Sequence, residues 1–465
     1  MLYHIVFIRD TNMPTLSAIS PLDGRYQAET EALLPYMSES ALYRARVQVE
    51  VEYLIFLSRA RKLDWVPPLD APQQATLRQL YRNWSLASAE GVAAWDRKIN
   101  HDVKAVEYWL RDRLTELGLE HWHELVHWAL TSEDVNNLAY ALLLQGARDR
   151  VILPNLQAIY AILRSFARDE ADTAMLARTH GQPATPTTLG KEMNVFAHRL
   201  HRAMDGIAAI KLTGKLNGAT GTYAAQVAAA PQIDWPTFSR GFIRMLELDP
   251  ILLTTQIEPH DTIAELCDAI RRANVILLDL DMDIWRYISD GYFLQQALPH
   301  EVGSSTMPHK VNPIDFENSE GNLHLANALL ELFARKLPIS RLQRDLSDST
   351  MMRSVGVALG YCLVAYSRTI KGLNKLSVNH PLLLQTVQAH PEVLAEAIQT
   401  ILRREQYPEP YEVLKHLTRG QTPTLTDIHA FIAELQVNPE VRDELLALVP
   451  EQYLGIAPAL ARLAP

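Results

Sequence analysis

Apolar residues recur at steps of three and four along much of the chain. The clearest run covers residues 262–290, which contain neither Gly nor Pro. This spacing predicts one helix about 44 Å long, at about 1.5 Å per residue. Its apolar seam consists of Ile263, Leu266, Ile270, Ala273, Leu277, Leu280, Ile284 and Tyr287. Val275, Ile276 and Leu278 are apolar but lie off the seam, so we expect burial on a second face, against other subunits.

A helix of this length needs neighbours of similar length to cover its seam. The periodic pattern predicts them at residues 132–169, 188–212, 319–337 and 347–376. Five such helices form a bundle. No segment shows a strong strand pattern, so any β-sheet should be small.

Shorter helical patterns flank this bundle. Residues 41–63 predict a helix that ends before Pro67, and after Pro381 the pattern breaks into shorter helices. The fold class is therefore mostly α, with three predicted domains. These are an N-terminal helical domain (1–121), a central long-helix bundle (122–375) and a small C-terminal helical domain (376–465).

Composition narrows the possible partners. The chain has 465 residues, 48% hydrophobic and 21% charged, as is ordinary for a soluble protein of several domains. Its formal net charge of −10 argues against nucleic acid, and an anionic ligand would need a local cluster of cations. Cys267 and Cys362 lie in apolar helical surroundings, so we expect core residues in a cytoplasmic protein. The N-terminal apolar run is too short to span a membrane and has no cleavage site.

Side chains capable of catalysis or ligand binding are most densely grouped in residues 303–318, GSSTMPHKVNPIDFEN. Pro308 and Pro313 prevent a continuous helix between them, and Gly303 allows conformations closed to other residues. Hydroxyl, imidazole, ammonium and amide groups follow one another here with few core-forming side chains. We interpret the segment as a loop that closes over an anionic ligand, and an ordinary polar turn is the alternative.

Three further segments place polar groups in turns or at helix ends. Asn100 is a plausible N-cap for a helix with Asp102 in its first turn, and a helix also opens at Thr131 and Ser132, where free N–H groups could hold an anion. His180 stands beside a glycine and before two prolines, which favours a fixed loop that exposes the ring for proton transfer. Glu317 is a possible carboxylate partner for that ring. A surface histidine is the alternative interpretation of His180.

Taken together, these motifs are similar to a known family. GSSTMPHKVNP resembles the shared motif of the fumarase/aspartase superfamily, whose members eliminate fumarate from a succinyl group. SPLDGRY (20–26) and ARTHGQPATPTTLGKE (177–192) resemble the adenylosuccinate lyases of the bacterial purine pathway. The similarity extends from about Ser17 to the C-terminus. Related lyases begin close to Met13, so residues 1–12 are interpreted as a dispensable extension.

The resemblance implies a β-elimination. A base removes a proton from the succinyl carbon, an acid protonates the departing nitrogen, and Lys310, Asn312 and loop N–H groups stabilise the carbanion. Residue types alone would pair His180 with His309. The resemblance instead assigns the base to Ser304 and the acid to His180.

Substrate contacts are implied by the same resemblance, with Glu317 in a supporting role. The implied substrate-binding residues are Arg25, Tyr26, Asn100, His101, Asp102, Thr131, Ser132, Gln256, Ser305, Lys310, Asn312, Asn318, Arg344, Ser349, Thr350, Met351, Met352 and Arg353. Among them, Arg344 and residues 349–353 are assigned to the nucleotide phosphate. The role of residues 217–221 is left open.

The implied assembly is a homotetramer in which each active site takes segments from three subunits. The implied substrates are adenylosuccinate, giving AMP, and the succinyl-carboxamide ribotide SAICAR, giving AICAR. No metal or organic cofactor, nucleic acid or membrane is implied. The alternatives are another lyase of the superfamily, such as argininosuccinate lyase or fumarase, and a non-catalytic scaffold like the crystallins that resemble argininosuccinate lyase.

Ser304→Ala is expected to abolish turnover while retaining substrate binding, because it removes the group assigned to proton abstraction. Steady-state turnover and substrate affinity of the variant check this. Near-normal turnover would move the role of base to His309.

Overall fold

The computed structural model describes residues 15–60, 62–296, 307, 309–418 and 423–464. It divides into two compact units made of discontinuous segments. The first contains the chain as far as Asn155 together with Ala203–Asn274 and Gly321–Ala365. The second contains Leu156–Arg202, Val275–Glu320 and the chain from Tyr366 onward. The three-domain division expected from the sequence stays a prediction.

Short and medium helices form the N-terminal part of the first unit. They are α1 (Gln27–Thr30), α2 (Leu34–Met37), α3 (Glu39–Leu57), α4 (Ala71–Arg82), α5 (Leu86–Ile99) and α6 (Asp102–Glu116). The hydroxyl of Ser38 caps α3 by accepting from the amide of Ala41 at 3.1 Å. Helix α3 is buried along most of its length and packs against α4 and α7. It ends before the predicted limit at residue 63.

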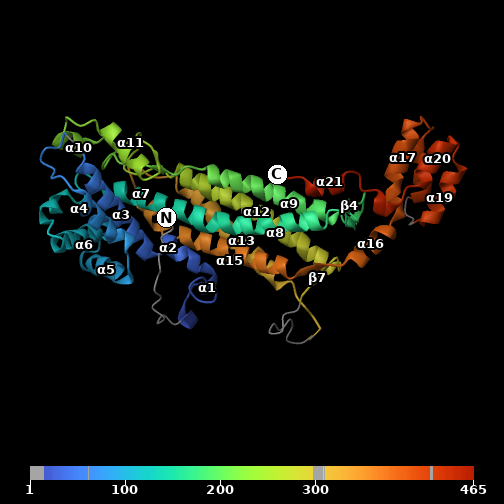
Figure 1. Cartoon of the computed structure of the whole chain (residues 1–465), viewed down its shortest axis with the longest axis horizontal. Helices are drawn as coiled ribbons and strands as arrows, with labels where there is room; N and C mark the ends of the chain where they lie inside the picture. Colours follow the sequence, from blue (N-terminus) through green and yellow to red (C-terminus); the bar gives the residue numbers. More distant parts are fainter. Residues whose placement is uncertain (1–14, 61, 297–306, 308, 419–422, 465) are drawn as a thin grey trace. The chain divides into compact units, whose positions relative to one another are not determined.

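Long helices dominate the rest of the chain, as the periodicity predicted (Figure 1). They are α7 (Ser132–Ala147), α8 (Leu153–Asp169), α9 (Leu189–Ala209), α12 (Asp261–Ser289), α13 (Ile314–Lys336) and α15 (Val355–Asn374). The predicted helix 132–169 is α7 and α8 joined by the π-helical turn Arg148–Ile152. Pro154 follows this turn and has no N–H for a regular bond to the preceding turn. The predicted helix 347–376 is interrupted after α14 (Ser347–Met352).

Polar contacts within each unit tie these helices together. In the second unit, Arg199 of α9 pairs with Asp279 of α12 at 2.5 Å, and the hydroxyls of Ser319 (α13) and Thr369 (α15) lie 2.8 Å apart. In the first unit, the amide of Asn274 on α12 donates to Asn327 of α13 at 2.9 Å. The helices therefore form the bundle that the sequence predicted.

The predicted seam of the longest helix is buried. All of its positions in α12 are buried in the core except Tyr287, which is half-buried. Of the apolar residues off the seam, Ile276 and Leu278 are half-buried and Val275 is 48% exposed. The second apolar face is therefore only partly covered within one chain.

The strands are short, as expected, and form two-stranded sheets. The antiparallel pairs are β1 (Ala174–Met175) with β4 (Thr187–Thr188), β2 (Arg178–Thr179) with β3 (Gln182–Pro183), and β7 (Phe293–Gln295) with β8 (Leu376–Val378). The parallel pair is β5 (Thr213–Gly214) with β6 (Asp249–Pro250). Helices α10 (Ala224–Ala229) and α11 (Trp235–Met245) lie between β5 and β6 in the sequence.

Shorter helices follow the bundle. They are α16 (His380–Gln388), α17 (Ala395–Arg404), α18 (Pro410–Thr418), α19 (Leu425–Glu434), α20 (Pro439–Leu446) and α21 (Ala457–Arg462). Leucines and isoleucines of α17 to α20 form a hydrophobic cluster of their own. Cys267 and Cys362 are free and buried, which confirms their prediction as core residues. No helix in the described part of the chain has the length and apolarity needed to cross a membrane.

A carboxylic acid lies inside the bundle of the second unit. Asp281 of α12 is 1% exposed, and its Oδ1 accepts a long hydrogen bond from the hydroxyl of Thr369 at 3.5 Å. Its Oδ2 is buried without a hydrogen-bond partner. Burial raises the pKa of Asp281 well above its ordinary value, so folding disfavours ionisation of this carboxyl group.

Asp281→Asn is expected to stabilise the protein at neutral and alkaline pH. The native pKa lies above the unfolded one, so the stability that Asp281 contributes is complete below the unfolded pKa and is lost as pH rises toward the native pKa. Asparagine resembles the protonated acid and carries no such cost, which is about 1.4 kcal/mol per unit of pKa difference. Urea unfolding of both proteins across a pH series checks this. An equal difference at acidic and alkaline pH would contradict it.

Candidate active site

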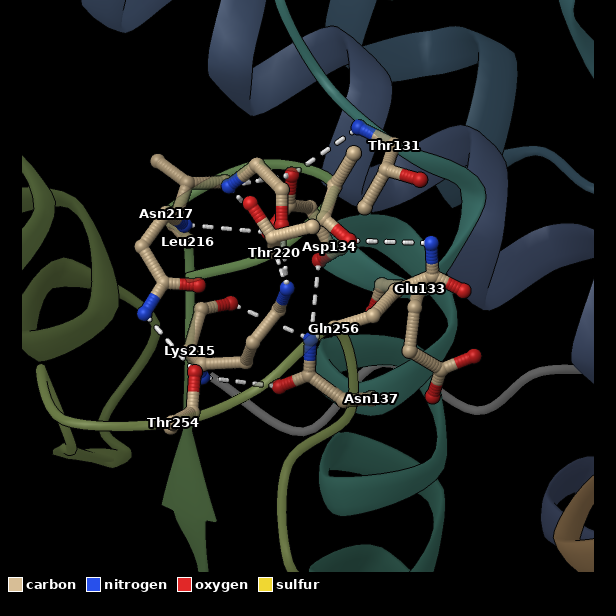
Figure 2. A network of polar contacts seen from close by, with 12 residues as sticks. Thr131, Glu133, Asp134, Asn137, Lys215, Leu216, Asn217, Thr220, Thr254 and Gln256 are labelled. Carbon is tan, nitrogen blue, oxygen red and sulfur yellow. Dashed lines mark hydrogen bonds and ion pairs between the residues drawn. The ribbon is translucent and has the colours of Figure 1, made fainter. Parts of the chain in front are cut away.

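The carboxylate of Asp134 is the centre of a buried polar network (Figure 2). Asp134 is the third residue of α7 and accepts a hydrogen bond from the amide of Thr131 at 2.9 Å, which closes a capping box at the start of the helix. The Nζ of Lys215 lies 3.0 Å from its Oδ1, and both side chains are fully buried. The amides of Asn217 and Gly218 also donate to Asp134, at 3.0 and 3.1 Å. One carboxylate therefore joins the start of α7 to the loop after β5.

Two glycines shape this loop. Gly218 and Gly221 have φ angles of +84° and +71°, in the left-handed region that favours glycine. A Cβ at Gly221 would lie 2.1 Å from the carbonyl oxygen of Thr254. The loop therefore needs glycine in order to pack against the segment that precedes α12.

The same loop holds Gln256 in place. The amide group of Gln256 donates to the carbonyl of Ala219 at 3.0 Å, and that of Asn217 donates to the hydroxyl of Thr254 at 2.8 Å. Residues 217–221, whose role the sequence left open, thus connect the Asp134 network to one of the predicted substrate-binding residues (Figure 2).

Three predicted segments meet at Arg344. Its Nη1 lies 3.5 Å from Oε1 of Gln256, and its Nη2 lies 3.2 Å from the carboxylate of Glu133, the neighbour of Ser132. The backbone of Gln256 also donates to the carbonyl of Gln343 at 3.3 Å. The structure therefore brings the start of α7, Gln256 and Arg344 together within one unit.

A second group of predicted residues gathers at the start of α6. The Nη2 atoms of Arg353 and Arg46 lie 2.6 and 2.8 Å from Oδ2 of Asp102. Arg353 also forms an ion pair with Glu39 at 2.8 Å. Although burial opposes ionisation, Arg46 and then Arg353 lower the pKa of Asp102 below its ordinary value.

The prediction that Asn100 caps this helix is wrong. Asn100 ends α5 with a left-handed φ of 52°, and His101 is the N-cap of α6. Nδ1 of His101 accepts from the amide of Lys104 at 3.1 Å. A histidine nitrogen replaces the expected asparagine oxygen because the chain turns at Asn100, a residue that tolerates the left-handed region.

Other predicted substrate-binding residues also lie in the first unit. Arg25 is exposed and Tyr26 is half-buried, in a turn where the amide of Tyr26 donates to the carbonyl of Pro21 at 2.8 Å. In α14, Thr350 is exposed while Ser349 and Met351 are half-buried. The side chain of Met352 is 4% exposed and belongs to the core.

His180 occupies the tip of a β-hairpin in the second unit. Strands β2 and β3 pair directly on either side of His180 and Gly181, which have φ angles of 53° and 76°. Positive φ at both central residues is the signature of a two-residue hairpin turn of type I′. His180 is exposed, as the sequence predicted.

The predicted catalytic loop is described only in part. Ser304 and Ser305 lie outside the described residues. His309 and Lys310 are exposed and Asn312 is half-buried. The amide of Lys310 donates to the carbonyl of Met307 at 3.1 Å.

Glu317 and Asn318 follow this loop in the first turns of α13. Oε1 of Glu317 accepts from the indole of Trp285 at 3.2 Å, so its pairing with His180 stays a prediction. Asn318 is half-buried.

Two buried groups near the Asp134 network had no assigned role in the sequence. These groups are Glu133 and His260. His260 lies 3.4 Å from both Glu258 and Asp348 and has a left-handed φ of 61°. Although burial opposes it, Asp348 and Glu258 raise the pKa of His260 to about 9. The sequence feature that could have identified His260 is the run Glu258-Pro-His-Asp, which directly precedes a long helix.

Comparison with known proteins places the chain among the lyases. Residues 24–327 match the lyase family and residues 340–454 match the adenylosuccinate lyase C-terminal family. A solved fumarate lyase from Mesorhizobium sp. BNC1 superposes with a TM-score of 0.73 at 18% identity, covering 93% of this chain and 96% of that one. A 3-carboxy-cis,cis-muconate lactonizing enzyme from Pseudomonas putida gives 0.71 at 20% identity, covering 93% and 95%. The fold is that of this lyase group.

Curated relatives narrow the family further. The chain is 48% identical over 451 residues to an adenylosuccinate lyase of Legionella pneumophila (strain Corby), covering 97% of this chain and 99% of the relative. It is 46% identical over 446 residues to the adenylosuccinate lyase of Escherichia coli (strain K12), covering 96% and 98%. The chain belongs to the adenylosuccinate lyase family.

Asp134→Asn is expected to lower the free energy of unfolding by about 3–5 kcal/mol, because Lys215 would remain buried without its counter-charge. Lys215→Met should cost less, since Asp134 keeps its three amide donors. Urea unfolding of the two single variants and the double variant measures their coupling. Strictly additive losses would show that the pair is not a buried ion pair.

Proposed function

We propose that this chain catalyses the β-elimination of fumarate from adenylosuccinate, giving AMP, and from SAICAR, giving AICAR. One observation carries the proposal: identity of 46–48% with adenylosuccinate lyases over 96–97% of the chain. Argininosuccinate lyase and fumarase, the alternatives within the superfamily, are disfavoured by this full-length match. The non-catalytic alternative is disfavoured because His180, Ser304, Lys310 and Asn312 are all present.

In this proposal His180 is the general acid and Ser304 the general base. The hairpin supports the first role because a short, fixed turn presents the imidazole to solvent or to a ligand. Lys310 and Asn312 stabilise the carboxylate of the carbanion intermediate, where negative charge accumulates. Glu317 orients the imidazole and favours its protonated form.

The other polar groups bind the substrate. Arg344 holds the phosphate together with residues 349–353, and Gln256 contacts the succinyl group or the loop. The contact between Arg344 and Gln256 supports a common binding surface. The start of α7 at Thr131 and Ser132 favours an anion through the helix dipole, although the amide of Thr131 itself donates to Asp134. Arg25, Tyr26, Asn100, His101, Asp102, Ser305 and Asn318 complete the proposed substrate contacts.

We further propose a cytoplasmic homotetramer with active sites shared between subunits. On α12, Val275, Met282 and Trp285 are 48, 58 and 43% exposed, at the spacing of one helical face. Leu325 and Leu332 of α13, also seven residues apart, are 51 and 38% exposed. Large apolar groups on long helices favour burial against further copies of the bundle. The two buried free cysteines fit a reducing compartment.

Addition of adenylosuccinate to the purified protein is expected to release fumarate and AMP, followed as loss of substrate absorbance. His180→Ala should lower turnover by about 100- to 10,000-fold, the range for general acid catalysis. His121→Ala, which removes an exposed histidine outside the proposed site, is the matched control and should retain full activity.

Two results would contradict this proposal. Absence of fumarate release from adenylosuccinate and SAICAR, with release from argininosuccinate or malate, would assign the chain to another reaction of the superfamily. Equal turnover of the His180→Ala and His121→Ala proteins would remove His180 from the mechanism.

A further inference from the structure

A carboxylate lies where the proposed function requires an anion-binding surface. Glu133 follows Thr131 and Ser132 at the start of α7 and is 4% exposed. Its Oε2 lies 3.2 Å from Nη2 of Arg344, whose other terminal nitrogen, Nη1, is 3.5 Å from Gln256. Glu133 therefore already pairs with the cation that is assigned to the substrate phosphate.

The carboxylate of Glu133 is not part of the Asp134 network. In Figure 2 the side chain of Glu133 extends away from Asp134 and Lys215, although the two acids are neighbours on α7. Asp134 has four partners of its own, Lys215 and three amides. Glu133 is thus free to exchange partners without breaking the scaffold that holds the site.

We propose that Glu133 is a positioning residue that holds Arg344 in the unliganded protein and competes with the anionic group of the substrate for this guanidinium. Binding of the anion then requires that Glu133 takes up a proton from solvent. This inference rests on the proposed function, because it assigns Arg344 to an anionic group of the substrate.

Charged groups from each neighbouring segment act on Glu133. Arg344 and Asp348 face it from the segment around the start of α14, His260 from the residues before α12, and Lys215 from the loop after β5. Burial raises the pKa of Glu133 to about 7, while Arg344 and His260 oppose this shift.

Two further charges lie near Glu133. Asp134 is adjacent to it on α7, and Glu258 contacts the imidazole of His260, which Asp348 contacts through its other ring nitrogen. His260 has a pKa raised to about 9, so it is a cation at neutral pH.

The two protonation states of Glu133 have opposite effects on Arg344. The ionised carboxylate attracts the guanidinium and repels an incoming phosphate. The protonated acid keeps a hydrogen-bonding role but leaves the charge of Arg344 to the ligand. If only the protonated state accepts the anion, affinity scales with the protonated fraction, which changes about tenfold between about pH 6 and pH 8 for a pKa near 7.

The test uses adenosine 5′-sulfate, whose sulfate ester does not titrate in this range, as a probe for the unmodified protein. Calorimetry is expected to show an affinity about tenfold weaker at pH 8 than at pH 6. Titrations in buffers with different ionisation enthalpies should show net proton uptake at pH 8. Glu133→Gln, which resembles the protonated acid, should bind tightly at both pH values and take up no proton.

Glu124→Gln is the matched control, because it neutralises an exposed glutamate that pairs with Arg111 outside the site. It should behave like the unmodified protein. The same pH dependence of affinity in the Glu133→Gln and unmodified proteins would overturn the inference. Absence of proton uptake by the unmodified protein would also overturn it, and this second measurement does not depend on a variant that folds. If the protein releases fumarate from adenylosuccinate but gives either of these two contradicting results, the inference fails and the proposed function stands. If no fumarate is released, the proposed function itself fails.

Discussion

The first unit depends on one buried charge pair, Asp134 with Lys215. Both side chains are fully buried, so neither charge has solvent to stabilise it. Asp134 compensates by accepting hydrogen bonds from three amides, one at the start of α7 and two in the loop after β5. A carboxylate with this set of donors fixes the relative positions of two segments that are about eighty residues apart in the sequence. The loop in turn positions Gln256.

The charged residues near this pair have different roles. Asp134 and Lys215 contact each other and nearby backbone groups, and they form the scaffold. Arg344 and Glu133 are less constrained, since Arg344 reaches Gln256 and Glu133 through longer contacts of 3.5 and 3.2 Å. His260 stabilises the surrounding acids as a cation between Glu258 and Asp348. In a protein of net charge −10, Lys215 and His260 offset the acids that surround Arg344, which leaves a local cation near the start of α7.

Much of the fold could be predicted because long helices repeat one simple pattern. The seam of α12 was predicted almost residue by residue, and only Tyr287 near its C-terminal end is incompletely buried. The sequence did not predict the π-helical turn between α7 and α8, nor the exchange of roles between Asn100 and His101, since both depend on local backbone geometry. The pairing of Asp134 with Lys215 could not be predicted either, because periodicity carries no information on which distant polar groups meet. The candidate site was predicted through motif resemblance, and the structure adds how Arg344, Gln256 and the start of α7 are connected.

The most direct test of the proposed active site is a structure of the Ser304→Ala protein with adenylosuccinate bound. We expect the nucleotide to contact Arg344 and the N-terminus of α7, with His180 of one subunit within hydrogen-bond reach of the departing nitrogen. A bound nucleotide that contacts neither Arg344 nor His180 of any subunit would contradict it.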